Sequence, residues 1–187
     1  MTRIIGGVLG SLRLKGAAKA TRPTSDRVKE SVFSILESMA AIQGARVLDL
    51  FAGTGALGLE ALSRGAASLV MVERDRDASR VCSENADKVR QGLKNIDLRP
   101  EIKLLVKSAD KAVGILGEID LLFVDPPYDL SNEFLLELLG RVRLSDNAVV
   151  VVERPSKSQE FANLPGLRRV KDTRYGDTSV SFLKKTD

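Results

Sequence analysis

The stretch "DLLFVDPPYDL" (residues 120–130) places a carboxylate, two prolines and a tyrosine directly after an apolar run. The apolar run predicts a buried strand, and Pro126 and Pro127 end it because neither has an N–H for a central ladder. Asp125 and the Pro126 carbonyl would then be two rigidly held acceptors for the hydrogens of an exocyclic amine on a nucleobase. Tyr128 could stack on that base. The alternative is a turn that only ends the strand.

Such an amine is a poor nucleophile because its lone pair is delocalised into the ring. Acceptance of its hydrogens by Asp125 and Pro126 would draw the nitrogen toward tetrahedral geometry and aim the lone pair at a methyl donor. Alignment of an activated donor could supply a large part of roughly 7–11 kcal/mol of the barrier. The sequence has no histidine and one cysteine, Cys82, which disfavours zinc sites and histidine-dependent triads. The expected chemistry therefore uses no metal.

A glycine-rich segment precedes this stretch. Within "LDLFAGTGALGLEAL", Gly53, Gly55 and Gly58 form a G-x-G-x-x-G pattern between a predicted strand and a predicted helix. Glycines there allow a sharp turn and a close backbone approach to a ligand. Glu73, at the end of the next predicted strand, could accept hydrogen bonds from ribose hydroxyls. Sites for NAD, FAD and S-adenosylmethionine all use such turns, and tight strand–helix packing alone would also explain the glycines.

Asp49 favours one of these ligands. It precedes Gly53 by four residues and is expected to face the same crevice. A pyrophosphate would be repelled by this carboxylate, whereas the sulfonium and amino groups of S-adenosylmethionine would be attracted to it. Asp110 follows the third predicted strand and could meet an adenine amino group or cap the following helix; the sequence leaves both open.

The elements that must position these residues alternate along the chain from residue 45. Short apolar runs predict buried strands, and the segments between them have helical periodicity. The expected strands cover 46–51, 68–73, 102–106, 120–125 and 147–153, and the expected helices 56–64, 77–92, 109–117 and 131–140. This alternation predicts a mostly parallel sheet with helices on both faces. The final segment predicts two strands added as antiparallel edges.

The first 44 residues follow a different pattern. "TRIIGG" and "SLRLK" could pair as a small hairpin. A helix is expected to begin near Thr24 or Ser25, with an apolar face that packs on the core. Arg22 and Lys29 would then lie on or near its exposed side.

Charge and composition narrow the class of protein. Residues 1–30 hold seven basic side chains against two acidic ones, although the net charge of the 187-residue chain is only +4. A basic appendage on a near-neutral body suggests a polyanionic partner, and a solvated basic surface is the alternative. No apolar run suggests a membrane span, and no signal peptide is recognised. One cysteine is typical of a reducing cytoplasm, where we expect the protein to act.

The motifs resemble those of a known family, the bacterial 16S rRNA (guanine-N2)-methyltransferases of the RsmD family. The glycine loop and "DPPY" (125–128) are shared by many amino-methyltransferases. The "RIIGG" (3–7) and "RPTSDRVKE" (22–30) stretches are more specific, and "VERD" (72–75) and "YGDT" (175–178) also match. The hairpin segment 8–20 departs from the expected pattern, so RNA contacts from residues 9–20 are in doubt.

The resemblance implies an α/β, Rossmann-like fold with a seven-stranded, mostly parallel sheet whose last strand is antiparallel. We expect one domain over residues 1–187, with an N-terminal extension (1–44) on a catalytic core (45–187). The implied cofactor is S-adenosyl-L-methionine, bound by Asp49, Phe51, Gly53, Thr54, Gly55, Glu73, Arg74, Asp110, Thr24 and Arg27. The implied partner is 16S rRNA or an assembling 30S particle, contacted by Arg3, Arg22 and Lys29. The implied target is guanine 966 in the family's rRNA numbering, and the chain is expected to be a monomer.

Three other functions remain open. A DNA adenine-N6 or cytosine-N4 methyltransferase could use the same Asp-Pro-Pro-Tyr stretch, although 187 residues leave no room for a separate target-recognition domain. An NAD-dependent oxidoreductase is disfavoured by Asp49 and by the lack of an obvious acid or base for hydride transfer. A non-catalytic RNA-binding protein would give no reason for Asp125 and the prolines.

Overall fold

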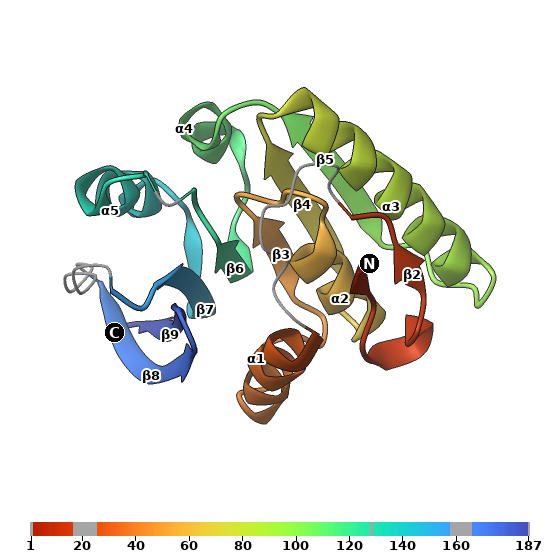
Figure 1. The fold of residues 1–187 in the computed structure, drawn as a ribbon, viewed down its shortest axis with the longest axis horizontal. Coiled ribbons are helices and arrows are strands. Elements are labelled where there is room, and N and C mark those ends of the chain that lie inside the picture. Colours follow the sequence, from red (N-terminus) through yellow and green to blue (C-terminus); the bar gives the residue numbers. More distant parts are fainter. Residues whose placement is uncertain (1, 17–25, 128, 158–165, 187) are drawn as a thin grey trace.

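A seven-stranded sheet forms the centre of the molecule (Figure 1). The computed structural model describes residues 2–16, 26–127, 129–157 and 166–186. The sheet order is β5-β4-β3-β6-β7-β9-β8. The strands are β3 (Arg46–Asp49), β4 (Ser68–Glu73), β5 (Glu101–Val106), β6 (Ile119–Val124), β7 (Leu144–Pro155), β8 (Leu167–Tyr175) and β9 (Thr178–Lys185). The predicted α/β fold is confirmed.

The direction of the strands divides the sheet into two parts. β3 to β7 are mutually parallel, and β9 runs antiparallel to β7 on one side and to β8 on the other. The expected antiparallel last strand is therefore confirmed. The prediction that the final segment adds two antiparallel strands at the edge of the sheet is confirmed: β8 is the outermost strand, and β9 lies between it and β7. Its Val180, Phe182 and Leu183 are buried, so the strand is stabilised by packing on both faces of the sheet.

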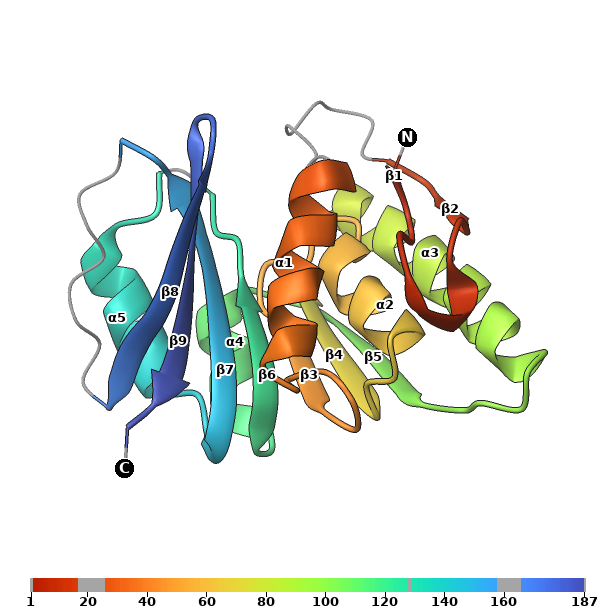
Figure 2. The same cartoon turned by 90° about the horizontal axis from the view of Figure 1, so that it is seen from below.

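Helices cover the two faces of the sheet, as Figure 2 shows. They are α1 (Asp26–Ser38), α2 (Ala56–Ser63), α3 (Arg76–Lys94), α4 (Ala109–Ala112) and α5 (Asn132–Gly140). One core packs α1, α2 and α3 against alternate strand residues such as Val47 and Phe123. The other packs α4 and α5 against the intervening residues, such as Leu48 and Leu122. This alternation follows from the period of two of a strand that is buried on both faces.

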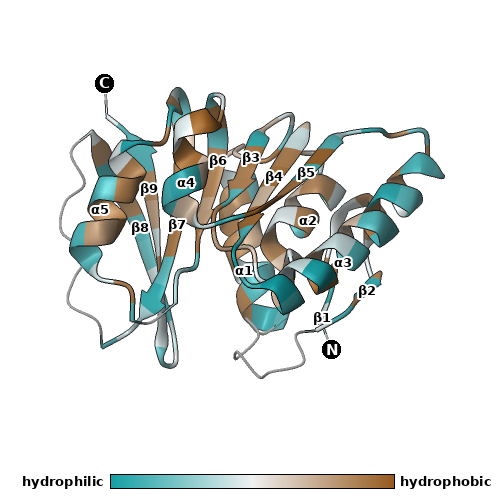
Figure 3. Cartoon of the chain, turned by 90° about the horizontal axis from the view of Figure 1, so that it is seen from above, coloured by the Kyte–Doolittle hydropathy of each residue, from teal (hydrophilic) through white to brown (hydrophobic). Residues whose placement is uncertain are grey.

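The helix predicted over 109–117 is shorter than expected. α4 ends at Ala112 and continues as a 3₁₀ turn, η2 (Val113–Ile115). Gly114 and Gly117 lie in this segment, and glycine is unfavourable in a helix interior. By contrast α3 is long, with a hydrophilic outer face (Figure 3). In the described part of the chain, no helix has both the length and the apolar character needed to cross a membrane.

The predicted N-terminal hairpin is confirmed. β1 (Thr2–Arg3) pairs antiparallel with β2 (Arg13–Leu14), and a 3₁₀ turn, η1 (Gly7–Leu9), lies between them. The hairpin packs on α2 through Ser63, whose Oγ donates to the Gly6 carbonyl (2.7 Å) and accepts from Leu9 N (2.9 Å).

A buried ionic network fastens this hairpin to α1 and α2. The fully buried carboxylate of Glu60 accepts from the backbone N–H groups of Ile5 (2.7 Å) and Gly6 (2.8 Å) and from Arg64 Nε (2.9 Å). Lys29 Nζ lies 3.6 Å from Glu60 Oε2 and donates to the Arg3 carbonyl. We call these groups the Glu60 network.

The prediction that Lys29 is exposed and contacts RNA is therefore wrong. Its side chain is 1% exposed. Lys29 precedes Val32, Phe33 and Leu36 by three, four and seven residues, which places it on the buried face of α1. Burial lowers the pKa of Lys29, and the carboxylate of Glu60 opposes this shift.

Candidate active site

The candidate site lies where the parallel strands end, which we call the carboxyl edge of the sheet. From β3 the chain passes first to β4 and β5 on one side and later to β6 on the other. Such a reversal opens a crevice at the carboxyl edge, where α/β proteins bind ligands. Asp49 ends β3, Glu73 ends β4, and Asp125 directly follows β6. The structure thus brings these three predicted carboxylates to one crevice.

The three glycines of the loop between β3 and α2 have different roles. Gly55 (φ +81°) is the N-cap of α2, and a Cβ there would lie 2.9 Å from Met71 Sδ and 3.0 Å from Cys82 Sγ. At Gly58 a Cβ would lie 2.6 Å from Leu69, so this glycine allows α2 to pack closely on the sheet. Gly53 (φ +53°) has no atom within 4 Å of a Cβ position, so its backbone borders open space. Gly53 is the glycine that a ligand could approach.

Glu73 holds the glycine loop in place. Its Oε2 accepts from Gly53 N (2.8 Å), and its Oε1 accepts from Asp75 N (2.7 Å). Each carboxylate oxygen has a second lone pair, so the residue can still accept from hydroxyl groups of a ligand. The partly buried Glu73 therefore lies beside Gly53, the loop glycine that borders open space.

Asp49 is more buried than the sequence suggests. Its side chain is 2% exposed, and its Oδ2 accepts from Gly58 N (3.0 Å) in the first turn of α2. Burial raises the pKa of Asp49 to about 7; the nearby charges of Asp125 and Glu73 also raise it, and the bond from Gly58 opposes the shift. A positively charged ligand in the crevice would favour the ionised form.

The loop after β6 holds Asp125 at the mouth of the crevice. Pro126 is buried and Pro127 is exposed, and the Pro127 carbonyl accepts from Leu130 N (3.1 Å) in a turn. Among the residues that the structure describes, no backbone N–H donates to the Pro126 carbonyl. Burial raises the pKa of Asp125 to about 6, so the carboxyl is mostly ionised at neutral pH. Tyr128 lies outside the described residues.

A small hollow adjoins Asp125, between α1 and the ends of β6 and β7. Its walls are apolar side chains, including Val32 of α1 and Leu57 of α2, together with Asp125 and Glu153. Glu153 was not among the residues predicted from the sequence. The sequence does contain a pattern that marks Glu153: it is an acidic residue directly after the apolar run of β7, as Asp125 is directly after the apolar run of β6.

Asn85 is a second residue that the sequence analysis missed. This fully buried side chain on α3 donates from Nδ2 to the Thr54 carbonyl in the glycine loop (3.0 Å). The same Nδ2 donates to the Lys15 carbonyl (3.0 Å), and Oδ1 accepts from Lys15 N (2.8 Å). Asn85 thus ties the glycine loop to the end of the N-terminal hairpin. No local pattern in the sequence marks this contact.

Those of the other predicted cofactor residues that the structure describes lie on separate loops and helices. Phe51 and Thr54 are partly buried in the glycine loop, and Arg74 is exposed after β4. Arg27 is exposed on α1, and Thr24 lies outside the described residues. Asp110 is not the cap of α4, because Ser108 occupies that position; a hydrogen bond from Ser108 lowers the pKa of Asp110. Its contact with an adenine stays a prediction.

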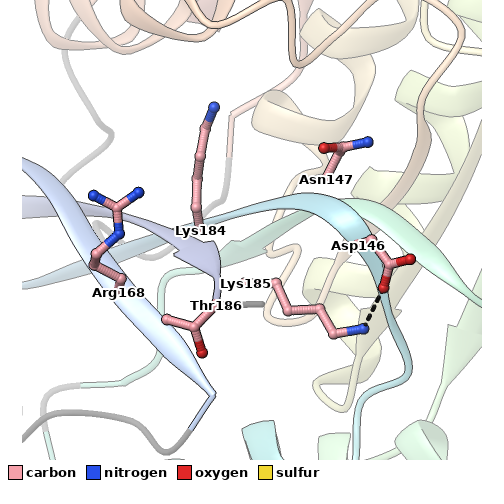
Figure 4. A pocket seen from close by; sticks show the side chains of 6 residues that line it. All are labelled: Asp146, Asn147, Arg168, Lys184, Lys185 and Thr186. Atoms are coloured by element: carbon pink, nitrogen blue, oxygen red, sulfur yellow. Dashed lines mark hydrogen bonds and ion pairs between the residues drawn. The ribbon is translucent and has the colours of Figure 1, made fainter.

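Of the predicted RNA contacts, only Arg3 is described and exposed. Arg3 Nε lies 3.1 Å from Asp26 Oδ2 at the start of α1, and Arg22 lies outside the described residues. A separate hollow at the opposite edge of the sheet is lined by Arg168, Lys184 and Lys185 (Figure 4). Lys185 there pairs with Asp146 (2.8 Å). Because the parallel strands begin at that edge, this hollow is separate from the crevice.

Comparison with known proteins identifies the family. A family model described as conserved hypothetical protein 95 matches residues 2–184. YlbH of Bacillus subtilis is 32% identical over 190 residues, which cover 98% of each chain. Ribosomal RNA small subunit methyltransferase D of Escherichia coli K12 is 35% identical over 154 residues, covering 81% of this chain and 73% of the relative. The solved structure of the Escherichia coli protein yhhF has a TM-score of 0.79 at 30% identity, covering 98% of this chain and 97% of that one. The chain is therefore a methyltransferase of the RsmD family.

Proposed function

We propose that this protein transfers a methyl group from S-adenosyl-L-methionine to the exocyclic N2 of a guanine in 16S rRNA, the position numbered 966 in the family. The observation that carries the proposal is that Asp125, followed by two prolines, directly follows β6 at the crevice of the glycine loop. The similarity to ribosomal RNA small subunit methyltransferase D supports the rRNA substrate. We further propose that the protein acts as a monomer in the cytoplasm on rRNA or an assembling small subunit.

The residues at the crevice fit the proposed cofactor. Gly53 borders open space, so a ligand can lie against the loop backbone. Glu73 beside it suits ribose hydroxyls, and Asp110 suits an adenine amino group. Asp49 and Asp125 make the crevice acidic, which favours a sulfonium and an ammonium over a pyrophosphate. When bound, S-adenosyl-L-methionine supplies a methyl group already activated by its positive sulfur.

The protein's own contribution is to orient the amine. Asp125 would accept one hydrogen of the guanine amino group, and the Pro126 carbonyl would accept the other. These contacts favour a tetrahedral nitrogen whose lone pair points into the crevice. The fixed backbone of the two prolines keeps both acceptors in place before the amine binds. The entropic cost of positioning these acceptors is therefore not added to the barrier of the reaction. After transfer, the proton of the nitrogen can pass to Asp125 or to water.

The rival function is methylation of an adenine or cytosine in DNA. Both bases carry an exocyclic amine, so Asp125 and Pro126 do not exclude them. The similarity over nearly the whole chain to YlbH, and over most of it to an rRNA methyltransferase, favours RNA. A non-catalytic RNA-binding role is disfavoured, because it requires neither Asp125 nor the open glycine loop.

The test is methyl transfer from labelled S-adenosyl-L-methionine to separate pools of small ribosomal subunits, naked rRNA and DNA, with the modified nucleoside identified by mass spectrometry. We expect N2-methylguanosine in rRNA. Asp125→Ala leaves no acceptor at this position and should reduce the rate at least about 100-fold, in the range expected for loss of a catalytic group. Its affinity for the cofactor should stay within a few-fold, since Asp125 contacts the amine. Label in DNA alone, or a fully active Asp125→Ala variant, would contradict the proposal.

A further inference from the structure

Two carboxylates from adjacent strands line the hollow at the candidate active site. Val124 pairs with Val152 in the parallel register of β6 and β7, so the next residues, Asp125 and Glu153, continue the two strands side by side. Adjacent strands lie about 4.8 Å apart. Phe123 and Val151, two residues earlier, both belong to the core on the α1 face, so Asp125 and Glu153 share that face. They are the polar residues among the described lining of this hollow.

We infer that Glu153 is a specificity-determining residue that accepts the N1–H of the target guanine while Asp125 and Pro126 engage the adjacent N2 amine. This inference rests on the proposed function. In guanine the atom beside the exocyclic amine on the Watson–Crick edge is N1, which carries a hydrogen. A carboxylate next to Asp125 is the matching acceptor, because an ionised carboxylate only accepts hydrogen bonds.

The same carboxylate would reject the rival bases. Adenine presents N1, and cytosine presents N3, as a bare lone pair beside its exocyclic amine. Either lone pair would face the Glu153 carboxylate without a hydrogen between them, which leaves two acceptors opposed in a partly buried site. Sites built to hydrogen-bond one group discriminate strongly against analogues that lack it. Glu153 therefore explains how an amine-orienting loop shared with other base methyltransferases can select guanine.

The experiment replaces the target guanine by 2-aminopurine, which keeps the N2 amine but has a bare N1. A synthetic rRNA segment carries either base and is used naked or in a reconstituted small subunit. The wild type should favour guanine over 2-aminopurine by roughly 100-fold or more. Glu153→Gln can donate from its amide to the bare N1, so its preference for guanine should fall at least about tenfold. Glu153→Ala should lower transfer to guanine about 10- to 100-fold without any gain on 2-aminopurine.

The absence of O6 in 2-aminopurine affects the wild type and the variant alike, so the change in their ratios isolates the N1 contact. Glu133→Gln, at an exposed glutamate of α5, is the matched control and should leave the ratio unchanged. Cofactor affinity and the unfolding midpoint of each variant separate a specificity effect from a folding defect. An equal guanine preference in the wild type and in Glu153→Gln would overturn the inference. A wild type that methylates no guanine would instead overturn the proposed function.

Discussion

At the residue scale, burial changes the chemistry of the carboxylates at the crevice. Asp49 and Asp125 have raised pKa values because they lie largely out of water, and each carboxyl stands where binding of a cation or an amine would favour its ionised form. Glu73 uses both oxygens to hold the backbone of Gly53 and Asp75. Replacement of Glu73 would therefore disturb the loop as well as any ribose contact. Asp125 is the cleaner residue for a test of the chemistry.

The pH dependence of methyl transfer should report the pKa of Asp125. The folded-state pKa is raised from 3.8 to about 6, so below about pH 6 the carboxyl binds a proton and loses the negative charge that makes it a strong acceptor. At saturating cofactor, the single-turnover rate should be level above pH 7 and fall about tenfold per unit below pH 6. Because the cofactor is saturating, the titration of Asp49 should not affect the measured rate. The pH dependence of cofactor affinity over the same range reports the titration of Asp49 separately. A rate that stays level down to pH 4.5 would contradict this assignment.

At the element scale, the N-terminal hairpin is held on the core by buried charges. The Glu60 network joins β1, the turn after it, α1 and α2, and Asn85 joins the hairpin's other end to the glycine loop. A charge removed from such a network leaves its partners buried without compensation. The hairpin and the glycine loop are therefore expected to be coupled in stability.

Glu60→Gln should destabilise the protein by about 3–5 kcal/mol, because it leaves Lys29 without its buried partner and turns one acceptor oxygen into a donor. Glu37→Gln is the matched control. Glu37 also pairs with Arg64 (2.7 Å), but its side chain is 53% exposed, so about 0–1 kcal/mol is expected. Urea unfolding followed by circular dichroism measures both. Equal effects of the two variants would show that the buried network adds nothing to stability.

At the scale of the whole molecule, the basic N-terminus is less free than its sequence suggests. Arg3 pairs with Asp26, Lys15 pairs with Glu84, and Lys29 is buried with Glu60. Arg3 and Arg13 are exposed and lie opposite each other in the hairpin. Arg3 contacts Asp26 at the start of α1, and Lys15, which follows the hairpin, is joined through Asn85 to the glycine loop at the carboxyl edge. A second basic group, Arg168 and Lys184, lies at the opposite edge.

Conversion of Arg3 and Arg13 to Ala should weaken RNA binding and reduce the slope of log affinity against log salt by roughly one to two units. The Arg168→Ala, Lys184→Ala double variant removes the same charge from the far edge and should change the slope less. Both slopes are measured by RNA binding at several salt concentrations, with cofactor affinity as a check on folding. A larger change in the second variant would place the RNA on the β8–β9 side of the sheet.

The sequence by itself determined the order of the core elements and most of the crevice. Each buried strand of the parallel part is a short apolar run in the sequence. The residue at the end of such a run, or just after it, lies at the carboxyl edge of the sheet. Asp49, Glu73 and Asp125 could be found in this way because a parallel sheet aligns its strand ends. The glycine loop could also be predicted from the sequence, because the positive φ angles of Gly53 and Gly55 favour glycine at these positions.

Only the tertiary structure decided which polar residues are partners. The spacing of Lys29 places it on the buried face of α1, but its partner Glu60 lies on another helix, α2. Asn85 contacts the glycine loop from α3. The placement of Glu153 beside Asp125 depends on the register of two strands separated by α5. The position of β9 between β7 and β8 also depends on contacts between segments that are distant in the sequence. Contacts between segments distant in sequence depend on how the elements pack against one another. The local periodicity of the sequence does not predict that packing.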